Sequence, residues 1–234
     1  MKEKFQSNRF DYLPEIETAH ERGVRAATIG LGLGRTAMLF SRVDRVPRYA
    51  DGERESDVEH SYMLGLVAPE IVHALNLPLD TGLVAQFSLV HDLVELKTGD
   101  TPTFHLTKEQ REYKEQEERR AVLELMQELP VYTARLLYDY EQQAYPEARF
   151  VRFVDKLLPI IVDIIGAGEK VMQEDYDITS VEQLQQCHLK LQARVRDMFG
   201  DEFPDLQLAH QLLCELFEAS VQSQGVMPER AQVA

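Results

Sequence analysis

The 234-residue sequence contains no tryptophan and only two cysteines, and it has no excess of basic residues. Cys187 and Cys214 are far apart and form no CxxC pair, which excludes a zinc ribbon or a disulfide framework. The N-terminal residues lack the apolar core of a signal peptide. The apolar stretch over residues 26–40 is interrupted by Arg35 and is too short to cross a bilayer. These absences predict a cytoplasmic protein with no membrane partner.

The formal net charge is -15, and hydrophobic residues make up 44% of the chain. A strongly acidic protein is poorly suited to bind a nucleic acid polymer or an anionic membrane, because both partners require a basic surface. A small anionic substrate remains possible, since it needs only a local positive pocket. The hydrophobic content and the length are sufficient for one large domain with its own core.

Helical patterns dominate the sequence, and no run of alternating residues bounded by hairpin turns is evident. We therefore expect an all-α, single-domain helical bundle without a sheet. Residues 1–32 are expected to form an N-terminal helical extension, and residues 33–234 the bundle, with its motifs in 45–168. Besides a helical N-terminus, helices are predicted from Ser56 to Leu75, Thr81 to Lys97, Thr107 to Leu129, Tyr132 to Gln143, Ala148 to Val171, Val181 to Met198 and Leu206 to Gln222.

Two of these helices carry a start signal of the capping-box type. Ser56 is followed by Glu59, and Thr107 by Gln110, so that each pair can satisfy its free backbone N–H groups reciprocally. Gly99 is a plausible end for the second predicted helix. The sequence thus marks the boundaries of the helices that carry most of the candidate site residues.

Ionisable residues occur in unexpectedly apolar helices. His60 lies near the start of one helix, His91 and Asp92 are adjacent in the next, and Asp155 lies in the apolar run RFVDKLLPIIVDII. Two imidazoles and two carboxylates suit a divalent metal ion with open coordination positions. Glu95 follows one turn after His91 and could orient or deprotonate a metal-bound water.

Each of these residues also has a structural interpretation. A His-Asp pair occurs by chance in many proteins, and His60 could be a partly exposed histidine at a helix start. Asp155 could pair with Lys156 or with an arginine across the core. A metal site is favoured because all of these features occur together and in this order.

The motifs EHS, HDLVE, TGD and VDK, preceded by DRVPR, resemble those of the HD-domain metal-dependent phosphohydrolases, and among them the 5′-deoxynucleotidase group. The resemblance covers residues 33–168. It implies an HD-type helical bundle, a homodimer, and one divalent ion (Mn, Co, Mg, Zn, Ni or Fe). The residue roles that the resemblance implies are metal ligation by His60, His91, Asp92 and Asp155, action on water and phosphate by Glu95 and Arg45, and substrate contacts by Arg45, Arg48 and Asp100.

One position departs from this group. Val46 follows Arg45 where a bacterial member has a tryptophan that helps to exclude ribose, so no sugar preference is predicted. Between Asp92 and Asp155 the only histidine is His105, and two-metal HD phosphodiesterases need more. This favours a single-metal phosphomonoesterase.

The predicted function is therefore a metal-dependent phosphohydrolase that removes phosphate from (deoxy)nucleoside 5′-monophosphates. Two alternatives remain open. The protein could hydrolyse another small phosphate ester or a nucleoside triphosphate, or it could be a non-catalytic nucleotide-binding module. Basic side chains such as Arg45, Arg48 and Arg54 are expected to supply the local positive charge for the phosphate.

Overall fold

The computed structural model describes residues 18–101 and 106–224, and most of them are helical. Residues 1–17 of the predicted extension and His105 lie outside the described residues. The elements in chain order are α1 (Ala19–Phe40), β1 (Asp44–Arg48), β2 (Arg54–Ser56), α2 (Asp57–Ala74), α3 (Thr81–Val90), α4 (Glu95–Thr98), α5 (Lys108–Glu128), α6 (Val131–Glu141), α7 (Pro146–Ile165), α8 (Gly168–Glu174), α9 (Val181–Phe199) and α10 (Pro204–Gln224).

Both predicted capping boxes are present. The Ser56 hydroxyl accepts a hydrogen bond from the Glu59 amide, and the Glu59 carboxylate accepts one from the Ser56 amide. Thr107 and Gln110 form the same reciprocal pair at the start of α5. Helix starts were thus readable from the sequence because short polar side chains there replace missing backbone partners.

The expectation that the chain contains no sheet was wrong in one place. β1 and β2 pair antiparallel, and the turn between them places Gly52 at φ +93°. The strands have five and three residues, and Pro47 lies inside β1, so the pattern was too short to reveal alternation. The all-α class is confirmed, since this hairpin is a small addition to a helical bundle.

The second predicted helix is not continuous. It ends at Val90, and four residues of turn precede α4. In this turn the Leu93 amide bonds to the Val90 carbonyl and the Glu95 amide to the Asp92 carbonyl, both three residues back. This tighter winding changes the direction of the chain at His91 and Asp92.

The helix predicted from Ala148 to Val171 is also interrupted. α7 ends at Ile165, and the Ala167 amide then bonds to the Arg48 carbonyl of β1 at 3.0 Å. A Cβ atom at Gly166 would lie 2.2 Å from the Arg48 carbonyl oxygen, so only glycine permits this approach. The contact fixes the β-hairpin against the end of α7.

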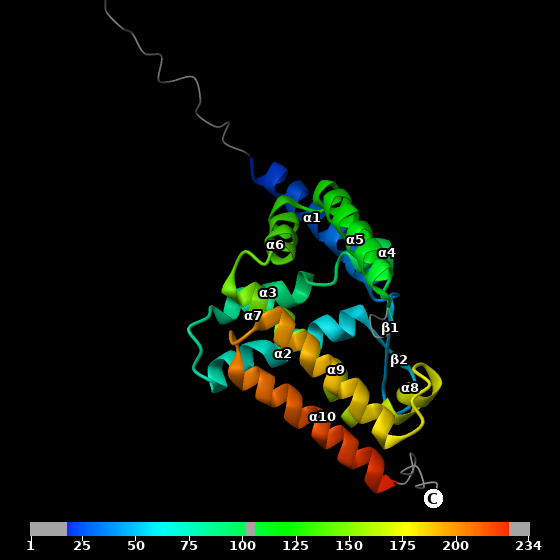
Figure 1. Cartoon of the computed structure of the whole chain (residues 1–234). Helices are drawn as coiled ribbons and strands as arrows, with labels where there is room; N and C mark the ends of the chain where they lie inside the picture. The colour runs from blue at the N-terminus through cyan, green and yellow to red at the C-terminus, as the bar shows by residue number, and fades with distance from the viewer. Residues whose placement is uncertain (1–17, 102–105, 225–234) are drawn as a thin grey trace, which may run out of the picture.

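The core consists of two clusters that meet near α7. The larger packs α2, α3, α6 and α7 around Phe87, Phe150 and Phe153, and the smaller joins α8, α9 and α10. Figure 1 shows α9 and α10 running antiparallel, side by side, along one side of the molecule. Among the described residues no helix is long and apolar enough to cross a membrane.

Candidate metal centre

The four side chains predicted as metal ligands converge between α2, α3 and α7. His60 lies on the first turn of α2, His91 and Asp92 lie in the turn after α3, and Asp155 lies near the middle of α7. Each offers one ligand atom, and these atoms all lie within 4.8 Å of one another. The group is therefore compact enough to surround one ion.

His91 directs one ring nitrogen at this group. Its Nδ1 lies 2.9 Å from the Ser88 carbonyl oxygen and donates to it, since a carbonyl only accepts. Its Nε2 lies 2.9 Å from Asp92 Oδ2 and 3.7 Å from Asp155 Oδ1, yet it is buried without a hydrogen-bond partner among the described residues. A nitrogen aimed at two carboxylates in this way fits a metal ligand, with the other nitrogen fixing the ring.

The ring of His60 also contacts Glu55, an acid that the sequence did not single out. His60 Nε2 lies 2.9 Å from Asp155 Oδ1, and its Nδ1 lies 3.4 Å from Glu55 Oε2. His60 and Glu55 are fully buried. A carboxylate behind a ligating imidazole orients the ring and raises its basicity. The signal that could have revealed Glu55 is its place in RESDVEH, where three acids, Glu55, Asp57 and Glu59, precede His60 at alternate positions.

Asp155 contacts both expected kinds of partner. Its Oδ1 faces the two histidines, while Lys156 donates to its Oδ2 at 2.6 Å. The interpretation of Asp155 as the partner of Lys156 and its interpretation as a metal ligand are therefore compatible, since they use different oxygens.

Arg45, from β1, lies among four carboxylates. Its Nη1 is 2.7 Å from Asp92, 3.0 Å from Asp57 and 3.9 Å from Glu95, and its Nε is 3.6 Å from Glu55. Asp57, Asp92 and Glu95 also form a group that could hold an ion. The guanidinium already supplies positive charge there. Burial lowers the pKa of Arg45, but the surrounding carboxylates outweigh burial and raise it above its usual range.

The acids here titrate far from their usual range because they are buried close together. Burial, followed by Asp92 and Asp100, raises the pKa of Glu95 to about 11. Burial opposes ionisation of Asp92 as well, but His91 and Arg45 hold the pKa of Asp92 well below its usual value. Burial lowers the pKa of His91, yet Asp92 and Asp155 raise it to about 10. A divalent ion would replace protons in this group, so its binding is linked to proton release.

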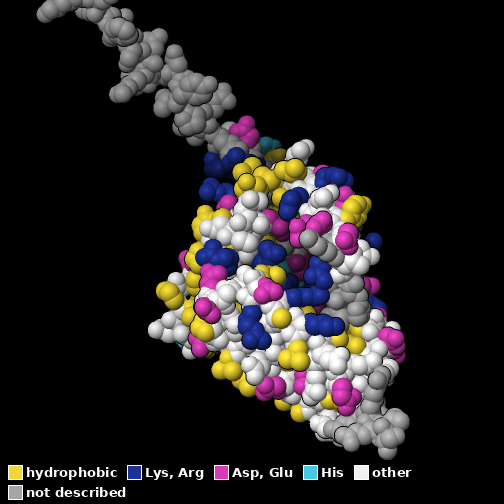
Figure 2. Space-filling view, viewed as in Figure 1, with side chains coloured by type: hydrophobic (Ala, Val, Ile, Leu, Met, Phe, Trp, Pro, Cys, Tyr) yellow, Lys and Arg dark blue, Asp and Glu magenta, His cyan; other side chains and the backbone are white. Residues whose placement is uncertain are grey.

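A cavity of about 470 Å³ opens onto this centre and is lined by His91, Asp92, Glu95, Asp100 and Asp155, among others. Figure 2 shows this face hollowed near its middle, with Lys and Arg side chains around the hollow and acidic side chains within it. We call the cations that line the cavity the cationic rim, and it consists of Arg111, Lys114, Arg152, Lys156 and Arg194. The rim was not predicted, because its members come from three separate helices.

Arg48 does not join the other predicted site residues. It pairs with Glu174 at 2.9 Å and with Asp175 at 2.7 Å, and it is not among the residues that line the cavity. Arg54 also bonds to Asp175, at 2.7 Å. Both arginines fix the hairpin to α8, so Arg45 and the cationic rim are the positive groups that face the cavity.

Comparisons with known proteins agree with this arrangement. A family model described as HD domain matches residues 41–195. The 5′-deoxynucleotidase HDDC2 of Mus musculus is 31% identical over 137 residues, which cover 54% of this chain and 66% of the mouse protein. The Homo sapiens protein of the same name is 31% identical over 128 residues, with 50% and 60% coverage. The aligned part is thus somewhat less than two thirds of either relative.

Solved structures show the same fold. A predicted metal-dependent phosphohydrolase from Magnetospirillum magnetotacticum has a TM-score of 0.63 at 23% identity, over 86% of this chain and 95% of that one. The cyanophage S-2L HD phosphohydrolase DatZ, bound to dA and one catalytic Zn²⁺ ion, has a TM-score of 0.52 at 22% identity, over 80% and 96%.

The chain belongs to the HD-domain family. This family is the one that the motifs predicted, and the solved structures named above share its fold.

Proposed function

We propose that this protein is a metal-dependent phosphohydrolase that removes the phosphate from (deoxy)nucleoside 5′-monophosphates. One observation carries the proposal: His60, His91, Asp92 and Asp155 offer ligand atoms within 4.8 Å of one another at the end of a cavity. The similarity to two 5′-deoxynucleotidases and to a phosphohydrolase that binds dA supports a nucleotide substrate.

These four residues would hold the divalent ion, whose chemistry is to lower the pKa of a bound water and to polarise the phosphoryl oxygens. The reaction adds water to phosphorus and breaks the bond between phosphorus and O5′, and O5′ takes up a proton. Arg45, which is buried and charged, would stabilise the charge on the phosphoryl oxygens. Glu95 lines the cavity and would hold the attacking water, while Asp100, which lines the same cavity, would contact a sugar hydroxyl.

The cationic rim supports a second candidate, a nucleoside triphosphate. Among the described residues, Arg194 forms no ion pair with an acid, and Arg152 has only a longer-range interaction with an acid, Glu141 of the same cavity. Arg111 lies close enough to Arg194 to help lower the pKa of Arg194, although burial is the larger cause. Cations that face one another across a cavity favour a highly charged anion between them.

A substrate panel tests the proposal. The purified protein is incubated with nucleoside mono- and triphosphates and with a simple phosphate ester, each with manganese, cobalt, magnesium or zinc. Release of inorganic phosphate from the monophosphates, with metal only, is the expected result. Conversion of triphosphates alone would favour the second candidate. Tight nucleotide binding without any hydrolysis would favour the non-catalytic module instead.

A pair of variants separates the two substrates. Arg194→Gln should lower kcat/KM for a triphosphate at least tenfold if the rim holds additional phosphates, and should change monophosphate hydrolysis less than twofold. Arg135→Gln is the matched control, because Arg135 is 75% exposed and pairs with Asp139 on α6. Equal effects of Arg194→Gln on both substrates would reject a role of the rim in binding further phosphates.

A further inference from the structure

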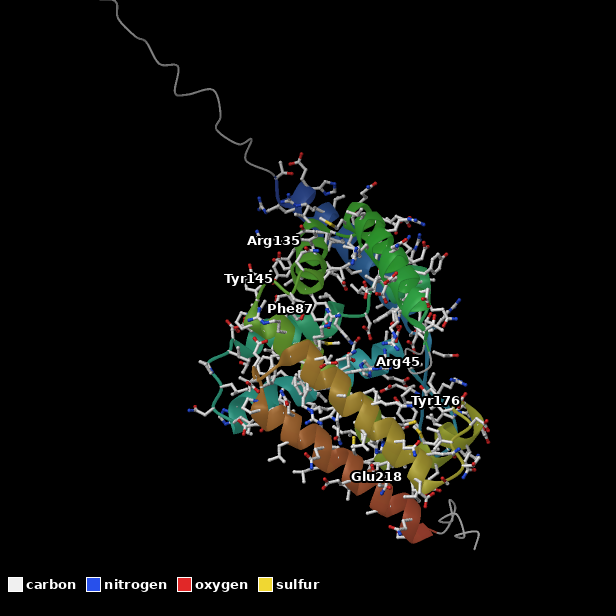
Figure 3. The ribbon with its side chains drawn as sticks, viewed as in Figure 1. Arg45, Phe87, Arg135, Tyr145, Tyr176 and Glu218 are labelled. Carbon is white, nitrogen blue, oxygen red and sulfur yellow. The ribbon has the colours of Figure 1, made fainter. Side chains whose placement is uncertain are left out.

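The cavity has a second end whose chemistry differs from that of the metal centre. It is lined by apolar side chains of α7, α8 and α9. Figure 3 labels Glu218 on α10, which borders this end of the cavity. The apolar residues that line this end, which we call the inner end, include Ile160, Met172, Leu184 and Val195. A phosphate has no cationic partner among these groups.

Two histidines also line the inner end. His188, on α9, is 4% exposed, and its Nδ1 lies 2.6 Å from Glu218 Oε1 of α10. His210, on α10, is 2% exposed, and its Nδ1 lies 3.8 Å from the Cys214 sulfur. Neither residue belongs to the metal centre. Each ring makes its side-chain contact through Nδ1, and neither Nε2 has a hydrogen bond among the described residues.

The charge state of these rings follows from their surroundings. Burial holds the pKa of His188 below its usual value, although Glu218 opposes this. Burial, with His188 as a smaller cause, lowers the pKa of His210 to about 4. Both shifts favour the neutral form of the ring. A carboxylate only accepts hydrogen bonds, so Nδ1 of His188 carries the ring proton and its Nε2 is an acceptor.

We infer that the inner end is a nucleobase subsite in which Nε2 of His188 accepts a hydrogen bond from an amino group on the edge of the base. This inference rests on the proposed function. A base is flat and mostly apolar, and it carries polar groups at its edge only, which matches an apolar slot with one fixed acceptor. The phosphate would occupy the metal centre, and the sugar would lie between the two ends, near Asp100.

The arrangement predicts a preference among bases. Adenine and cytosine present an exocyclic amino group as a donor, and an unsubstituted purine does not. A buried acceptor left without its donor is costly, so the unsubstituted purine should bind less well. His188 would thus determine specificity through binding and would take no part in the chemical step.

The experiment compares 2′-deoxyadenosine 5′-monophosphate with purine 2′-deoxyriboside 5′-monophosphate, which lacks only the amino group. We expect the wild-type protein to favour the adenine nucleotide at least tenfold in kcat/KM, mainly through KM. His188→Phe should reduce this preference to less than twofold. Hydrolysis of p-nitrophenyl phosphate, which has no base, should stay within twofold of wild type. His73→Phe is the control, because His73 is an exposed histidine on α2.

Wild-type protein that hydrolyses both nucleotides equally well would overturn the inference and leave the proposed function intact. So would a His188→Phe variant that keeps the full preference. Should no substrate be hydrolysed, the proposed function fails, and calorimetric Kd values of the two nucleotides for wild-type protein still decide on the subsite. The wild-type comparison does not depend on whether a variant folds.

Discussion

The two ends of the cavity differ in the charge of the side chains that line them. At the metal centre, buried acids gather around Arg45 and two imidazoles, and every one of them has a positive or potentially positive neighbour. At the inner end, two buried histidines, whose pKa values burial lowers, are set in an apolar wall. A strongly charged end suits the reacting phosphate, and a neutral end suits a part of the substrate that is recognised but not changed.

The two ends also differ in how the chain builds them. The metal centre takes its residues from short motifs at element boundaries, such as the capped start of α2 and the turn after α3. The inner end takes single residues from four helices, α7 to α10, without a common motif. Under the proposed function, this contrast would allow catalysis and base recognition to vary independently.

Removing Asp92 should give the largest effect, because Asp92 contacts both His91 and Arg45. We expect Asp92→Ala to lose bound metal and to lower phosphate release by at least ~10³-fold, because both the ion and its charge partner are disturbed. Metal content by plasma mass spectrometry and phosphate release are measured together. Asp197→Asn, an exposed change on α9, should match wild type. Full activity of Asp92→Ala without bound metal would contradict the assignment.

Replacing Arg45 should be the next most damaging change. Arg45→Ala leaves Glu55, Asp57 and Glu95 without their shared cation, and removing one partner from a buried ion pair costs about 3–5 kcal/mol. Activity should fall about 10²–10³-fold through the lost stabilisation of phosphoryl charge. Arg45→Lys keeps a charge and should recover part of the stability in urea unfolding but little of the activity. Equal kcat in all three proteins would show that Arg45 is only structural.

The sequence predicted the metal centre better than the inner end, for a physical reason. His60, His91, Asp92 and Asp155 stood out because ionisable residues are rare in apolar helices, and the structure brings them together. The rim and the inner end are lined by residues that are ordinary for their helices. Their function depends on tertiary packing, which no short window of sequence contains.

The same limit explains the errors in secondary structure. The boundaries of α6, α9 and α10 were predicted to within about two residues, because capping and periodicity are local signals. The breaks after Val90 and Ile165 were missed, since they depend on the turn at the metal centre and on the approach of β1 to Gly166. The homodimer, the cytoplasmic location and the boundary at residue 32 stay predictions.

The contact between β1 and the end of α7 can be tested by adding one methyl group at Gly166. Gly166→Ala places a Cβ atom 2.2 Å from the Arg48 carbonyl oxygen, which forces the backbone to move. We expect a loss of about 1–3 kcal/mol in the free energy of unfolding. Gly30→Ala in α1 meets nothing within 4 Å and should be neutral or stabilising by up to ~1 kcal/mol. Equal stabilities of the two variants would show that the hairpin is not fixed here.

Asp163 gives the smallest and most specific test, because it is a buried acid that lacks, within the described part of the chain, the cationic partner that the acids of the metal centre have. It lines the cavity, and its Oδ1 is buried without a partner among the described residues. Burial, with Glu55 as a smaller cause, raises the pKa of Asp163 to about 8. The folded protein therefore keeps a proton that the unfolded chain, with a pKa near ~3.9, releases.

The sign of the effect follows from this difference. Stability from Asp163 is fully present at low pH and is lost as pH rises towards about 8, by at most ~1.4 kcal/mol per pH unit. Asp163→Asn cannot ionise, so its free energy of unfolding should exceed that of wild type increasingly from pH 5 to pH 8. Urea unfolding of both proteins at several pH values measures the difference. Parallel curves would mean that Asp163 is ionised in the folded protein and has a partner, as the acids of the metal centre do.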